Sequence, residues 1–194
     1  MIMGTILLFS IPSINETLSQ NETLTIVDPF GKFSIDYPSD WEAIVPGHRF
    51  EEGNIDLIIQ KPDRQQGYIE VRHEELPNQE IKESNKTNFL SPLNNISLNI
   101  ILSYSFQNYL STNDLQKVRQ VEGFSYNKYV IISDMNTGSI VYSFERDGMK
   151  FYGLYILSKN DYNILYISYI ASENYFYKNI GEVEKIISSF KTHL

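Results

Sequence analysis

The stretch that decides the fold is residues 139–170, which read SIVYSFERDGMKFYGLYILSKNDYNILYISYI. Asp147-Gly148 stands between two strand-like runs, and this dipeptide in that position is among the strongest short signals for a β-hairpin. A third run follows a polar connection at 158–161. The pattern predicts an antiparallel meander whose strands span 128–133, 139–146, 149–157 and 162–170, with residues 134–138 as the first connection.

The last two of these strands are apolar on both faces. Successive side chains of a strand point to opposite sides of its sheet. One face of the strand at 149–157 carries Phe151, Tyr155 and Leu157, and the other carries Tyr152, Leu154 and Ile156. A sheet that is apolar on both faces must be covered on both faces, so the sequence predicts a layer on each side.

Two helices are available to form these layers. Residues 172–192 carry an apolar stripe at steps of four and three, formed by Phe176, Ile180, Val183, Ile187 and Phe190. A second helix is predicted from Ser91-Pro92, as N-cap and first position, to Leu110. No charged residue occurs between Lys86 and Asp114, so the outer surface of this helix is Asn, Ser and Gln.

The N-terminal half supplies further strands. Alternation predicts two strands around a turn, followed by two more, at 24–27, 32–37, 55–60 and 68–72. Trp41 follows a turn and is expected to fill an edge of the core, and residues 77–92 read as a loop. The fold class that follows is α+β, an antiparallel β-sheet sandwiched between helices.

Two short motifs of the sequence resemble those of a known superfamily. Residues 33–41, FSIDYPSDW, and the closing Ile186-Ile187-Ser-Ser-Phe190 resemble the PsbP-like superfamily over roughly residues 24–194, including exported proteins of ammonia-oxidising archaea. The resemblance implies an α/β/α sandwich and a role in protein binding rather than catalysis. It carries over no photosystem-binding residue, and Phe33, Tyr37, Pro38 and Trp41 are expected to be structural.

Composition excludes several functions. The chain has 194 residues, a net charge of −8 and no cysteine. Nucleic-acid binding needs a basic patch, and the sequence has no Lys/Arg cluster, so we expect no nucleic-acid partner. The lack of cysteine removes disulfides, thiol catalysis and thiolate metal sites.

The N-terminal segment predicts export. Residues 1–11 are apolar and uncharged, too short to span a bilayer but of the length of a signal-peptide core, although no Lys or Arg precedes Lys32. Residues 13–25 are polar and read as a stalk. We expect residues 1–23 to be a signal peptide or membrane-contacting anchor with a stalk, and residues 24–194 to be a domain secreted or anchored on the extracytoplasmic face. An N-terminal strand or an apolar tail is the alternative.

Candidate reactive residues form no convincing constellation. Ser125 follows Gly123-Phe but lacks the second glycine of a nucleophile elbow. The remaining candidates are the scattered histidines His48, His73 and His193, the calcium-loop-like spacing of Asp134, Asn136 and Glu145, and the carboxylates Glu70, Glu74, Glu75 and Glu80. Turn chemistry explains Asp134 and Asn136 better than calcium does. We therefore expect no catalytic, cofactor-binding or metal-binding residue.

Three functions stay open in a definite order. The first is a non-catalytic extracytoplasmic binding or accessory domain that holds a protein partner, with the uncharged helix surface at 91–112 as its contact face. The second is a small-ligand or metal-binding domain that uses a pocket among the Tyr-rich strands. An enzyme is third, because the residues that catalysis needs are absent or scattered.

Overall fold

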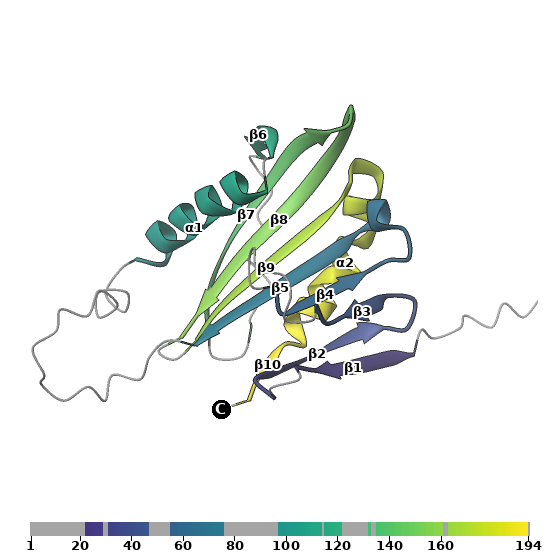
Figure 1. Cartoon of the computed structure of the whole chain (residues 1–194), viewed down its shortest axis with the longest axis vertical. Coiled ribbons are helices and arrows are strands. Elements are labelled where there is room, and N and C mark those ends of the chain that lie inside the picture. The colour runs from purple at the N-terminus through teal and green to yellow at the C-terminus, as the bar shows by residue number, and fades with distance from the viewer. Residues whose placement is uncertain are drawn as a thin grey trace, which may run out of the picture.

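The computed structural model describes residues 22–28, 31–46, 55–75, 97–113, 115–121, 132, 135–160 and 163–193 (Figure 1). In chain order the elements are β1 (Thr23–Val27), β2 (Phe33–Pro38), β3 (Glu42–Ile44), β4 (Leu57–Gln60), the 3-10 turn η1 (Arg64–Gln66), β5 (Tyr68–Glu75), α1 (Leu98–Thr112), β6 (Gln116–Gln120), β7 (Asn136–Arg146), β8 (Met149–Lys159), β9 (Asn163–Ser172), α2 (Glu173–Ser188) and β10 (Lys191–Thr192). None of the described helices is long and apolar enough to cross a membrane.

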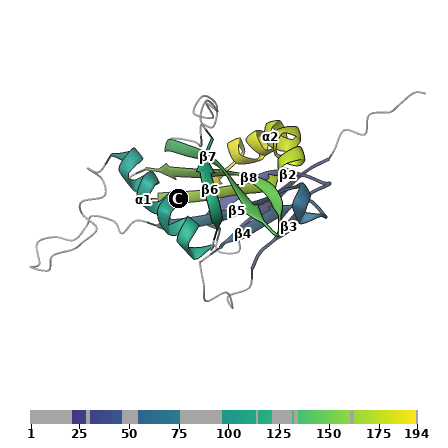
Figure 2. The same cartoon turned by 90° about the horizontal axis from the view of Figure 1, so that it is seen from above.

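The strands form two antiparallel sheets. The large sheet has the order β3-β4-β5-β9-β8-β7-β6, and the small sheet has the order β1-β2-β10. α1 packs on β7 and β8, whereas α2 packs on β8, β9 and β2. Figure 2 shows the two helices on opposite sides of the large sheet. The predicted α+β fold, an antiparallel sheet between helices, is confirmed.

Three of the four predicted meander strands, at 139–146, 149–157 and 162–170, are β7, β8 and β9 of the large sheet, and the neighbour of β7 on its other side is β6. β7 and β8 pair from Asn136↔Lys159 to Arg146↔Met149, and the turn residues Asp147 and Gly148 have φ values of 52° and 75°. Two central residues with positive φ form the turn that matches the twist of a hairpin, and glycine adopts this conformation without strain. The Asp-Gly prediction is confirmed.

Each face of the large sheet has its own core. Phe151, Tyr155 and Leu157 lie in the core under α1, together with its residues Ile101, Leu102 and Phe106. Tyr152, Leu154 and Ile156 lie in the core under α2, together with Phe33, Trp41, Phe176 and Phe190. The predicted division of the two faces is confirmed. Because successive side chains of β8 point to opposite faces, each face carries apolar residues and needs a helix to cover it.

The C-terminal helix is shorter than the sequence predicts. It ends at Ser188, not Thr192, and residues Lys191–Thr192 pair with β2 as β10. The Ser189 hydroxyl accepts the Asp36 N–H at 2.8 Å and donates to the Ile186 carbonyl at 2.7 Å. The chain leaves the helix there, and the Phe190 ring stacks on Phe33 at 5.0 Å. Phe190 is therefore a core residue from an extended segment and not from the helical stripe.

Other boundaries also differ. α1 begins at Leu98 behind Ser97, whose ψ of 133° is not helical, and the predicted start at Ser91-Pro92 lies outside the described residues. β7 begins at Asn136, so the predicted connection through residue 138 is wrong there. The sequence does not predict β3, which has only three residues, or β6, which has only one apolar side chain, because neither shows an alternating pattern. Of the predicted strand at 128–133, only buried Ile132 is described.

Candidate functional site

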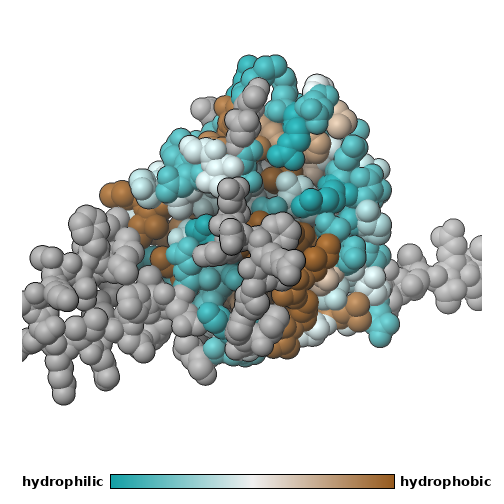
Figure 3. Space-filling view, in the orientation of Figure 1, coloured by the Kyte–Doolittle hydropathy of each residue, from teal (hydrophilic) through white to brown (hydrophobic). Residues whose placement is uncertain are grey.

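The outer side of α1 is the surface that the sequence singles out as a contact face. Ile100 is 64% exposed and Tyr104 is 71% exposed, and their spacing of four puts them on one side of the helix. The surrounding exposed side chains are uncharged, and the set, named here the α1 surface, is Asn99, Ile100, Ser103, Tyr104, Gln107, Asn108, Ser111 and Thr112. Figure 3 shows apolar side chains at the left end of this helix, beside paler and polar ones.

The inner side of α1 fixes the position of this surface. Ile101, Leu102 and Phe106 are buried against the sheet. The Tyr109 hydroxyl lies 2.7 Å from Ser168 Oγ of β9, and the Tyr142 hydroxyl donates to Tyr109 at 3.2 Å. These contacts turn one side of the helix toward the sheet and leave the α1 surface on the outer side.

Burial keeps the two tyrosines neutral. It raises the pKa of Tyr109 and the pKa of Tyr142 well above the ordinary value, because the phenolate would lose its hydration. A general base or nucleophile needs the opposite shift. The hydroxyls of Tyr109, Tyr142 and Ser168 join α1 to the sheet.

The tyrosines of the central strands fill the core. The ring of Tyr142 lies 5.1 Å from that of Phe106, and the ring of Tyr155 lies 5.5 Å from Phe106. A Cβ added at Gly153 would come within 2.2 Å of the Tyr142 ring, so the glycine makes room for that side chain. These rings pack on one another and on the backbone.

A strip of paired charges follows β5 on the same face. The Arg64 guanidinium lies 4.0 Å from the Glu70 carboxylate and 4.5 Å above the Tyr68 ring. Burial raises the pKa of Glu70, and the nearby Arg64 and Arg146 oppose that shift. Further along, Arg72 pairs with Glu74 at 3.1 Å and covers the Tyr166 ring at 4.2 Å.

Two members of the candidate carboxylate group lie in this strip. Glu70 and Glu74 each have an arginine beside them. The side chain of Glu75 and all of Glu80 lie outside the described residues. Within the described ranges, no three His, Asp or Glu side chains come together as a metal site.

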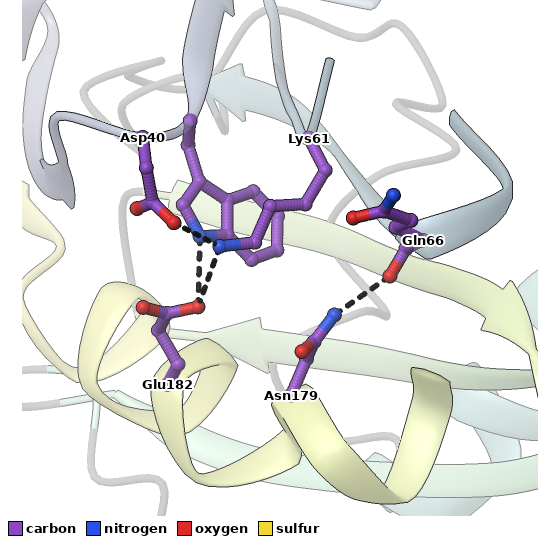
Figure 4. A network of polar contacts seen from close by, with 6 residues as sticks. Asp40, Lys61, Gln66, Asn179 and Glu182 are labelled. Carbon is purple, nitrogen blue, oxygen red and sulfur yellow. Dashed lines mark hydrogen bonds and ion pairs between the residues drawn. The ribbon is translucent and has the colours of Figure 1, made fainter. Parts of the chain in front are cut away.

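On the opposite face, a polar network attaches α2 to the sheet (Figure 4). Trp41 Nε1 donates to Glu182 Oε2 at 2.9 Å, and Lys61 Nζ lies 2.6 Å from Asp40 and 3.1 Å from Glu182. The Lys61 ammonium also lies 4.7 Å from the Trp41 ring centre. Trp41 is buried, as the sequence predicts for a residue at the core edge. Sequence reasoning missed its partners, since Glu182 is 141 positions away.

The remaining candidates are dispersed. His73 Nε2 lies 2.8 Å from Asn163 Oδ1 with its ring 6.0 Å from Phe33, and the His193 N–H donates to the Lys32 carbonyl at 2.8 Å. Asn136 and Glu145 lie near opposite ends of β7, and Glu145 pairs with Lys117. Ser125, His48 and Asp134 lie outside the described residues. The structure brings none of the described candidates together.

Comparisons with known proteins agree on the fold. No family model matches the sequence, and no curated protein matches it. Solved structures of similar fold span about nine tenths of the chain. Cyanobacterial PsbP (CyanoP) from Synechocystis is 13% identical, with a TM-score of 0.58, and covers 91% of this chain and 96% of its own.

Two further structures come from distant organisms. LpqN of Mycobacterium tuberculosis, described as involved in cell envelope biogenesis, is 10% identical with a TM-score of 0.56, and the match covers 90% of this chain and 92% of LpqN. The Ran-binding protein Mog1p of Saccharomyces cerevisiae is 9% identical with a TM-score of 0.53, and the match covers 89% and 96%. At these identities the likeness concerns the fold, and the fold of this chain is that of PsbP.

Proposed function

We propose that this chain is a non-catalytic accessory domain that binds another protein through the α1 surface. The observation that carries the proposal is the exposure of Ile100 and Tyr104 on a helix without charge. The cores of protein interfaces are poor in charged side chains and rich in aromatic ones, and a tyrosine anchor can supply much of the binding energy. The α1 surface has this composition, and α1 is packed on β7 and β8.

The partner that fits is a protein with an uncharged, partly apolar recess. The eight side chains of the α1 surface offer amide and hydroxyl groups around an apolar pair, so a charged partner surface would gain no ion pair here. The name of Mog1p, a Ran-binding protein, supports this reading, because it records protein binding by another chain of the same fold. The fold alone does not carry a function from one chain to another.

The proposal includes a location outside the cytoplasm. Its support is the apolar, uncharged run at residues 1–11 and the polar residues 13–22 before β1, which suit an export signal or anchor followed by a stalk. A partner would then be found on the cell exterior. The mature N-terminus, determined by mass spectrometry after cell fractionation, tests the location independently of the contact surface.

Site-specific cross-linking tests the contact surface. A photoreactive phenylalanine analogue replaces Tyr104 in the full chain within its native cells, and a control chain carries it at Met149, which is 41% exposed at the β7–β8 turn. We expect a discrete protein adduct at position 104 that Ile100→Lys abolishes, and no such adduct at 149. Adducts that are absent at 104, or the same at both positions, would contradict the proposal.

A further inference from the structure

The two sheets of the described residues end in four edge strands, β1, β10, β3 and β6, which differ in their protection. β6 has a register shift between Gln116 and Arg119, a positive φ at Lys117 and two exposed basic side chains. β3 has only three residues, and β10 has only two. Bulges, charges and short length are the devices by which edge strands avoid pairing with other chains. Three of the four edges therefore carry such a device.

β1 carries none of these devices. Its sequence, TLTIV, has no charge and no proline, and its pairing with β2 is regular over all five residues. Leu24 is 37% exposed and Val27 is 54% exposed. No described strand pairs with the outer edge of β1. Figure 1 places this strand at the end of the molecule away from α1, so the edge is separate from the α1 surface.

The hydrogen-bond register shows which backbone groups are available. The Asp28 N–H donates to the Phe33 carbonyl, and the Ser39 N–H donates to the Glu22 carbonyl, both across the β1–β2 ladder. Hydrogen-bonded and non-bonded positions alternate in an antiparallel pair. The even-numbered residues of β1 therefore bond to β2, and Thr23, Thr25 and Val27 direct their N–H and C=O groups outward.

We propose that β1 pairs antiparallel with β1 of a second copy of this chain, about a two-fold axis at Thr25. In this register Thr25 faces its own copy, and Thr23 faces Val27 of the other chain. All three residues direct their backbone groups to the interface, so the ladder closes without a shift. The two small sheets become one continuous sheet.

The side chains of β1 suit a second copy. Leu24 and Ile26 share one face, and Ile26 packs on the core under α2. Antiparallel pairing extends that apolar row with the same two side chains of the second copy, and it covers exposed Leu24. Since β1 has no charge, no like charges meet across the new pair. An isologous contact of this kind closes as a dimer and does not propagate.

Electrostatics adds a specific expectation. Each copy carries a net charge of −8, so two copies repel one another beyond the contact itself. Salt screens this repulsion, while backbone hydrogen bonds and apolar burial remain. Dimerisation through β1 is therefore expected to strengthen as the salt concentration rises, the reverse of an interface held by ion pairs.

Sedimentation of the full chain over a range of concentrations tests the proposal. We expect a monomer–dimer equilibrium that Thr25→Pro abolishes, because proline removes an outward N–H while the backbone bonds to β2 remain. Thr25→Pro and Thr25→Ala both lose the hydrogen bond from Thr25 Oγ1 to Asp36 Oδ1, so this loss is the same in the variant and its control. Thr25→Ala keeps that N–H and is the matched control, so its dimer is expected to persist. Thermal unfolding of each variant confirms that it is folded.

A second variant and a second readout keep the test decisive. Thr25→Lys places like charges opposite one another at the axis and is expected to lose the dimer even if Thr25→Pro fails to fold. The Thr25 amide should exchange slowly with deuterium in the dimer and rapidly after dilution. A chain that stays monomeric at all concentrations, or a dimer that both variants leave intact, would overturn the proposal.

Discussion

The two helices that cover the large sheet differ in what they show to solvent. α2 has an outer side with charged residues, and its inner residues Phe176, Val183 and Ile187 are fully buried. It is also attached through Glu182 to Trp41 and Lys61. α1 has no charge and leaves Ile100 and Tyr104 exposed. α2 also leaves Tyr177 48% exposed, with its ring against Tyr152 and Phe176. The difference is therefore that α2 combines charged residues with one half-exposed tyrosine, whereas α1 exposes two apolar side chains on an uncharged surface.

Truncating the central aromatic residue of each helix should show this difference most strongly. Phe176 is completely buried, so Phe176→Ala is expected to lower the free energy of unfolding by about 3–5 kcal/mol. Phe106 of α1 is 6% exposed, and the loss of unfolding free energy caused by Phe106→Ala should lie at or below the lower end of that range. Denaturant unfolding measures both. An equal or larger loss at Phe106 would show that α1 is as structural as α2.

The network beneath α2 should give the next largest effect. Glu182→Ala leaves Trp41 Nε1 buried without its acceptor and removes one of the two carboxylates around Lys61. We expect a loss of about 1–3 kcal/mol, the usual penalty for an unsatisfied buried polar group. Trp41→Phe combined with Glu182→Ala should lose less than the sum of the single changes, measured by thermal unfolding. Strict additivity would mean that the two residues do not act together.

The parts of the fold that sequence could predict are those with long periodic patterns. The apolar runs of β8 and β9, the Asp-Gly turn and the stripe of α2 all act locally, so they were predictable. β10 and β3 exist because β2 and β4 offer them a partner, and two or three residues hold no pattern of their own. The Trp41–Glu182 contact joins residues 141 apart and had no local signal. The exposed side of α1 was predictable because its lack of charge is a local property.

The attachment of α1 should be weaker than that of α2. Tyr109→Phe removes the hydroxyl that meets Ser168 and Tyr142 while it keeps the ring. We expect a loss of about 1 kcal/mol in the free energy of unfolding. Hydrogen exchange of the α1 amides should rise while that of α2 is unchanged. A change spread equally over both helices would argue against separate attachments.

A pH-dependent effect is expected on the charged strip next to α1. Burial raises the pKa of Glu70 from its ordinary value of 4.5, so the folded state binds its proton more tightly than the unfolded state does. The Glu70 contribution is therefore most favourable below that ordinary value and is lost as pH rises through the folded pKa. Glu70→Gln should be stabilising relative to the wild type near neutral pH and less so in acid. Urea unfolding of both proteins near neutral pH and in acid measures this difference. An opposite trend would show that the charges of Arg64 and Arg146 outweigh the effect of burial on Glu70.

The central claim is that the α1 surface binds a protein partner, and the affinity of the cross-linked partner for surface variants tests it most directly. Asn99→Lys with Asn108→Lys adds two charges to that surface, and Asn174→Lys with Ser188→Lys adds the same charge to exposed positions of α2. Both pairs should leave the unfolding midpoint nearly unchanged, because exposed substitutions have small effects on stability. The α1 pair is expected to raise Kd by roughly 10-fold or more, since about 1.4 kcal/mol of lost binding energy suffices, while the α2 pair keeps the wild-type Kd. Wild-type affinity of the α1 pair would contradict the account.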